Sequence, residues 1–259
     1  MVEKNKIFNN LKDRNIAITD GVFAIAMTIL ALEIAVPAVS EISSGAALNE
    51  YFISYLLPTI LIYFISFYIV YNFWESTSIL FQFKKISDSV LTLNMITMAS
   101  VCLIPFATGF LFEFHDYTNA NIFFSLLILI ISLLYILMFI LLIRGNFKEY
   151  FEKKDEIKAT MSETYDDGVE FDNLKLYVKG VTLTLLYILL SPVISSIISL
   201  ILAFFSPLAS ILSFLLILIL RFLIRMGRTS KDKLEDVELN DEEKEFLGNI
   251  KACIYGSED

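Results

Sequence analysis

Long apolar runs constrain this chain more than any other feature of its sequence. A helix needs about 20 apolar residues to cross roughly 30 Å of hydrocarbon. Six such runs occur, over residues 17–37, 51–74, 90–113, 120–143, 177–204 and 207–226. With 56% hydrophobic residues in a chain of 259, the apolar surface exceeds what a soluble core can bury. We therefore predict an all-α integral membrane protein of six transmembrane helices.

Prolines mark where these helices are expected to end or bend. Only Phe205 and Ser206 separate the last two runs ahead of Pro207, and proline disfavours helix at the residue before it. This spacing predicts a tight helical hairpin. Three further prolines lie inside other runs, where neighbouring helices can satisfy the freed carbonyl groups, and so predict kinks more than breaks; they are Pro58, Pro105 and Pro192.

Lys and Arg residues are distributed unevenly among the connections between the runs. They occur before the first run, after the second, after the fourth and after the sixth, whereas the other three connections contain none. Because Lys and Arg near helix ends are retained on the cytoplasmic side, both termini are predicted to be cytoplasmic. Residues 1–228 then form one transmembrane domain, and residues 229–259 form an acidic cytoplasmic tail.

The sequence also argues against several classes of function. No basic cluster is interleaved with aromatic residues in a soluble segment, so nucleic acid is not an expected partner. No cluster of His, Asp, Glu, Cys or Ser at membrane depth supplies a nucleophile with a base, or three metal ligands. We therefore predict no enzymatic activity, no catalytic residue, no cofactor and no bound metal.

Polar residues at membrane depth are concentrated in the first run, where each is costly in lipid. Asp20 falls in the expected first helical turn, where the helix dipole stabilises a carboxylate. Small residues permit close approach to other helices and predict a central position for this helix; they are Gly21, Ala24, Ala26, Thr28 and Ala31. Ile25, Thr28 and Leu32 are spaced i, i+3 and i+7 and share one helix face. From spacing alone, that face is compatible with ordinary helix packing.

The first run also contains a recognisable motif. Arg14-x-x-x-Ile18-Thr19-Asp20 resembles the first-helix signature Arg-x-x-x-Phe-Ser-Asp of the transmembrane protein 175 potassium-channel family. Trp74, the pair Leu93-Asn94 and the segment from Ile104 to Thr108 resemble further elements of that family. The resemblance covers about residues 12–112. The chain departs from the family at Ile18, at Thr19, and where two histidines often follow the tryptophan.

The resemblance implies a potassium channel of the cell membrane, in which four copies of the chain bring their first helices around one pore. Carried over by position, Ile25 forms an apolar constriction, Thr28 a ring of hydroxyl groups and Leu32 a further apolar ring. The motif residues Arg14, Ile18, Thr19 and Asp20 are then expected to fix the pore helix against the second and third helices. Supporting roles fall to Trp74, Asn94 and Thr108, of which the last two are expected to hydrogen-bond between helices.

Two other activities remain compatible with the sequence. The chain could conduct protons along transient water, or it could be an ion-coupled secondary transporter that uses Asp20. Transporters often contain inverted repeats and interrupted helices at the midplane, and neither is evident in this sequence. No helix with regularly spaced arginines is present, so we expect a leak-type, weakly voltage-dependent conductance for potassium.

Overall fold

The computed structural model describes residues 2–34, 44–83, 86–164 and 171–232, and the regular structure within these ranges is helical. Five segments are long and apolar enough to cross a membrane, and a sixth apolar segment, Pro207–Leu223, is shorter. The elements are α1 (Val2–Leu32), α2 (Gly45–Tyr51), the π-helical η2 (Phe52–Leu56), α3 (Leu57–Leu80), α4 (Asp88–Val101), α5 (Leu103–Phe114), α6 (Thr118–Thr164), α7 (Phe171–Ala203), α8 (Pro207–Leu212) and α9 (Leu215–Asp232). The described chain is thus an all-helical, multi-pass membrane protein. The predicted tail, apart from its first residues, lies outside the described ranges.

Prolines have different effects in different helices. Pro105 cannot donate to the carbonyl of Val101, and the helix is interrupted between them at Cys102, where only a kink was expected. Pro192, by contrast, lies inside the unbroken helix α7. There the hydroxyl of Ser191 donates a 2.9 Å hydrogen bond to the carbonyl of Ile188, which is the group that Pro192 leaves unpaired. In α7 a neighbouring hydroxyl thus satisfies the carbonyl that the proline leaves free.

The expected hairpin between the last two helices is present. Helix α7 ends at Ala203, and Ser206 caps α8 by accepting a 3.4 Å hydrogen bond from the amide of Ala209. Helix α1 differs from its expected bounds, because it begins at Val2 and ends at Leu32. Asp20 is consequently in the middle of the helix, and its assignment to a first turn is wrong. The apolar run marks the part of the helix suited to the membrane, but the polar residues before it continue the same helix.

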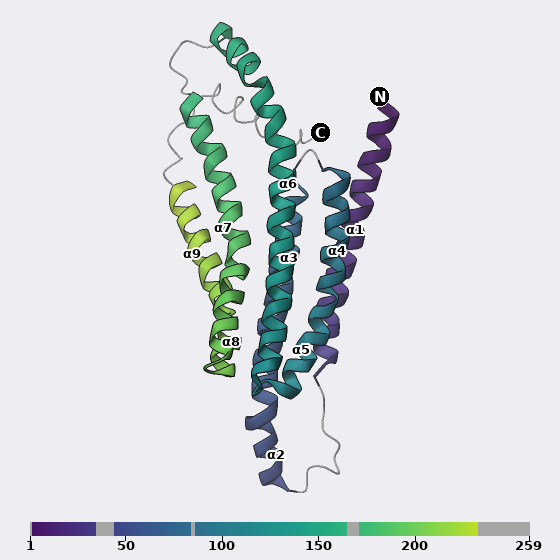
Figure 1. Cartoon of the computed structure of the whole chain (residues 1–259), viewed down its shortest axis with the longest axis vertical. Coiled ribbons are helices and arrows are strands. Elements are labelled where there is room, and N and C mark those ends of the chain that lie inside the picture. The colour runs from purple at the N-terminus through teal and green to yellow at the C-terminus, as the bar shows by residue number, and fades with distance from the viewer. Residues whose placement is uncertain (1, 35–43, 84–85, 165–170, 233–259) are drawn as a thin grey trace.

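Helix α1 lies at the edge of the bundle, where it packs against α3, α4 and α5 (Figure 1). The most extensive packing joins α6 to α7, and α8 and α9 pack against α7. The prediction of a central helix is therefore wrong for a single chain. Helix α1 begins and α9 ends toward the same end of the bundle, as an even number of crossings requires (Figure 1).

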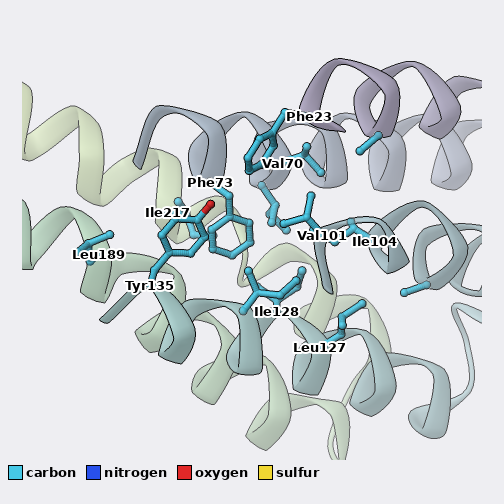
Figure 2. Packing of buried hydrophobic residues seen from close by; sticks show 14 of the residues in the cluster. Phe23, Val70, Phe73, Val101, Ile104, Leu127, Ile128, Tyr135, Leu189 and Ile217 are labelled. Atoms are coloured by element: carbon cyan, nitrogen blue, oxygen red, sulfur yellow. The ribbon is translucent and has the colours of Figure 1, made fainter. Parts of the chain in front are cut away.

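One hydrophobic core joins the helices from α1 to α9 (Figure 2). At its centre the rings of Phe73 and Tyr135 stack with their centroids 5.2 Å apart. Tyr135 is fully buried, and its hydroxyl lies 2.5 Å from that of Thr77. The phenol is thus satisfied inside an apolar core, as a buried tyrosine hydroxyl usually must be.

Serine side chains connect α6, α7 and α8. The hydroxyl of Ser199 lies 2.6 Å from that of Ser125 and 2.8 Å from that of Ser210. All three residues are buried. Small hydroxyl residues allow membrane helices to approach closely and to hydrogen-bond across the interface, so this seam holds the hairpin against α6.

Candidate functional site on helix α1

Helix α1 has two faces with different surroundings. One face is buried against α3, α4 and α5, and its residues recur at intervals of three and four; they are Thr19, Phe23, Ala26 and Leu30, each at most 3% exposed. The other face is not covered by any described part of the chain and contains Ile18, Gly21, Ala24, Ile25, Thr28 and Leu32, all exposed. We call these the buried face and the open face. Their spacing follows the helical repeat.

The three predicted pore residues all lie on the open face. Ile25 is 60% exposed and Leu32 is 81% exposed, with Thr28 exposed between them. In the span formed by α1, Arg14–Leu32, only 22% of the most apolar stretch is buried, which is the smallest share among the five long spans. The mean hydropathy of this span is nevertheless the lowest of the five. The least apolar of the five long spans therefore has the smallest buried share. If its exposed surface faced only lipid, the most apolar span would be favoured for that place.

Thr28 holds its hydroxyl group in a defined orientation. The hydroxyl donates a 2.8 Å hydrogen bond to the carbonyl of Ile25, three residues earlier in the same helix. Because a hydroxyl has one donor and two lone pairs, its oxygen still has lone pairs available to a cation. The position of Thr28 between two apolar side chains puts that oxygen on an otherwise apolar surface.

A polar contact fixes the buried face to α4. The amide nitrogen of Asn94 donates to the hydroxyl of Thr19 at 2.9 Å and to the side-chain oxygen of Asn15 at 2.8 Å. The Thr19 hydroxyl in turn donates to the backbone carbonyl of Asn15 at 2.7 Å. Asn15 was not among the predicted site residues, because it precedes the apolar run, but it lies one helical turn before Thr19.

Asp20 contacts α3. The indole nitrogen of Trp74 donates a 2.9 Å hydrogen bond to the carboxylate of Asp20, and the ring of Tyr71 lies 5.7 Å from that of Trp74. Together with Asn94, this contact sets the rotation of α1 about its axis. The rotation decides which residues occupy the open face.

Three other predicted site residues are placed differently from expectation. Ile18 and Arg14 are exposed, and Ile18 shares the open face with Ile25 instead of packing against the second and third helices. Thr108 is fully buried, but its hydroxyl donates to the carbonyl of Ile104 in its own helix at 2.9 Å, and not to another helix. Local back-bonding of this kind is a common alternative for threonine in helices.

The end of α1 at Leu32 approaches α5 closely. A Cβ atom at Gly109 would lie too close to a carboxylate oxygen of Glu33, so a larger residue there would require the Glu33 side chain to move. Within the described ranges, no group of three His, Cys, Asp or Glu residues is arranged to hold a metal ion. The site is therefore a helix surface, with polar contacts behind it.

One partly buried ion pair was not predicted. Arg221 on α9 pairs with Glu75 on α3, and its side chain is only 10% exposed. Arg221 lies within the sixth apolar run, residues 207–226, and no contact was predicted for it. The signal that could have found this pair is a carboxylate directly after Trp74, at the end of an apolar run.

The fold and this surface define a multi-pass helical membrane protein in which one face of α1 is exposed within the described ranges. A family model described as the endosomal/lysosomal potassium channel TMEM175 matches residues 14–105, which include the whole open face. A potassium channel from Chryseobacterium sp. (strain P1-3) is 28% identical over 177 residues, which cover 68% of this chain and 84% of that protein.

Structural comparison extends the similarity beyond the matched segment. The crystal structure of a lysosomal potassium-selective channel TMEM175 homolog from Chamaesiphon minutus matches with a TM-score of 0.58 at 20% identity. The match covers 83% of this chain and 98% of that one. These findings confirm the resemblance to the TMEM175 potassium-channel family, which is a family of ion channels and not of enzymes.

Proposed function

We propose that this chain is one subunit of a homotetrameric, potassium-selective, leak-type channel of the cell membrane, with the open face of α1 lining the pore. The observation that carries the proposal is the open face itself. It contains Ile25, Thr28 and Leu32 on a helix whose opposite side is held by hydrogen bonds. The names of the similar proteins support potassium as the permeant ion.

A ring of identical chains explains why the open face is not covered by the described residues of one chain. Closed cyclic symmetry places the same helix face of every copy around one axis, so each residue of α1 becomes a ring. Rings of Ile25 and Leu32 form narrow apolar constrictions, and such constrictions exclude strongly hydrated ions and gate by dewetting. Potassium sheds its water more readily than sodium and therefore passes preferentially.

The Thr28 ring supplies oxygen atoms between the two constrictions. Each hydroxyl hydrogen is directed to the carbonyl of Ile25, so the oxygen lone pairs replace part of the hydration shell that the ion loses. Oxygen ligands from the protein are the general means by which channels compensate a dehydrated cation. No apolar run of the sequence carries a series of arginines at every third position, so the conductance is weakly voltage-dependent.

The test is the reversal potential of the purified protein in planar bilayers with opposed potassium and sodium gradients. The unmodified channel is expected to reverse near the potassium equilibrium potential, and Ile25→Asn to shift that value toward the sodium potential. Leu133→Asn is the matched control, because Leu133 is an apolar residue of α6 with a similar exposure of 51%. If both substitutions shift the reversal potential equally, or if neither shifts it, the result contradicts a pore on α1.

The same recording separates the alternative activities. A reversal potential that follows the proton gradient identifies a proton channel. Macroscopic flux without single-channel steps, indifferent to Ile25→Asn and Thr28→Ala, identifies a transporter. Steep activation by voltage would contradict the leak-type behaviour.

A further inference from the structure

A single arginine joins the last described helix to α3. One guanidinium nitrogen of Arg221, Nη2, lies 2.9 Å from the side-chain oxygen of Asn72 and 3.0 Å from the hydroxyl of Ser76. It also lies 3.3 Å from the backbone carbonyl of Asn72, and the other terminal nitrogen, Nη1, pairs with the carboxylate of Glu75. One side chain thus contacts three residues within little more than a turn of α3.

The residues that flank this arginine in α9 are apolar. Its neighbours Phe222 and Leu223 are 60% and 58% exposed, and the apolar segment Pro207–Leu223 includes Arg221. A charged group at membrane depth is costly unless it is paired, and it normally faces protein. Removal of either charge leaves the other uncompensated in a poorly solvated place. The pair therefore admits few alternative depths or rotations of α9 against α3.

The same segment of α3 is also held from the other side. Trp74, adjacent to Glu75 in sequence, donates its indole hydrogen to Asp20 in the middle of α1. Consecutive residues of a helix project about 100° apart, so Glu75 and Trp74 contact different neighbours from the same backbone segment. Hydrogen bonds from one segment of α3 therefore reach α9 on one side and α1 on the other.

We propose that Arg221 is a positioning residue for the pore helix, acting through Glu75 and Trp74. The ion pair fixes the height and rotation of α3 near Trp74, and the contact of Trp74 with Asp20 transmits that setting to α1. The rotation of α1 in turn decides how Ile25 and Thr28 face the pore axis. This inference rests on the proposed function for its effect on permeation. The linkage from Arg221 to Trp74 is independent of that function.

The chain provides its own probe of this linkage, because Trp74 is its only tryptophan. Intrinsic fluorescence of the full-length protein in lipid nanodiscs therefore reports the surroundings of Trp74 alone. Arg221→Gln and Glu75→Gln are each expected to shift the Trp74 emission to longer wavelength, as the indole loses its fixed partner. The double substitution is expected to shift it no further than the larger single effect, since the two residues act as one unit.

Two further variants guard against a loss of folding. Arg221→Lys keeps the positive charge but loses the planar fork that reaches several acceptors, so an intermediate shift is expected. Arg144→Gln removes an equal charge from an exposed arginine near the middle of α6 and is expected to leave the emission unchanged. The proposal is overturned if Arg221→Lys and Arg144→Gln both shift the Trp74 emission as far as Arg221→Gln does.

Recordings of the same samples connect the linkage to permeation. Arg221→Gln is expected to move the reversal potential toward the sodium value. The same variant should shift the Trp74 emission and leave the size of the oligomer unchanged. An unshifted Trp74 emission in Arg221→Gln overturns the linkage, whatever the currents show. A shifted emission with an unchanged reversal potential overturns the effect on the pore. An unmodified protein without potassium selectivity contradicts the proposed function and leaves the linkage to be decided by fluorescence.

Discussion

The buried and open faces of α1 lie on one helix, yet they differ in every contact. The buried face is packed against three helices and fixed by a hydrogen bond from Asn94, and Trp74 hydrogen-bonds the adjacent Asp20. The open face contains residues as apolar as Ile25 and Leu32, and none of them is buried within the chain. Hydrophobicity alone therefore does not separate the two faces. The polar contacts behind the helix do so, because they select one rotation.

This difference separates stability from permeation. Substitutions on the buried face are expected to change the free energy of unfolding of the chain. Substitutions on the open face are expected to change only the current. The most direct comparison uses the same substitution on both faces.

Leu30 and Leu32 provide the matched pair with the largest expected difference. Leu30 is fully buried and Leu32 is 81% exposed. Leu30→Ala leaves a cavity and is expected to lower the free energy of unfolding by about 2–5 kcal/mol, measured by denaturant titration in mixed micelles. Leu32→Ala is expected to change it by no more than about 0.5 kcal/mol. Similar losses in both variants would contradict the assignment of the two faces.

Asn94→Leu tests the polar contact that selects the rotation of α1. The substitution removes the hydrogen bonds to Thr19 and Asn15, and a loss of about 1–2 kcal/mol is expected. The free energy of unfolding is again the measurement. Asn49→Leu on α2 is the control, because Asn49 is exposed. A neutral Asn94→Leu would show that apolar packing alone holds α1.

Two threonines on opposite faces allow the smallest and sharpest comparison. Thr19→Val removes a buried hydroxyl that accepts from Asn94 and donates to the carbonyl of Asn15, with an expected loss of about 1 kcal/mol. Thr28→Val removes a hydroxyl bonded only within its own helix and is expected to be neutral for stability. Thr28→Val should instead reduce the single-channel potassium conductance. A destabilised Thr28→Val with normal conductance would reverse the assignment.

Sequence patterns predict the membrane helices because length and apolarity are local properties. The hairpin at Ser206 is equally local, since it depends on Pro207 and its capping serine. The motif in α1 also led from the sequence alone to the family whose model matches residues 14–105. What could not be read locally was the start of α1, because polar residues before an apolar run can continue the same helix.

The helical repeat alone placed Ile25, Thr28 and Leu32 on one face, and composition alone required a membrane. The tertiary structure decided that this face is open, because the contacts of Asn94 and Trp74 with α1 bring together residues far apart in the chain. It also decided that Arg221 is a buried partner of Glu75. The two residues are 146 positions apart, and only packing of α9 against the bundle brings those charges into contact.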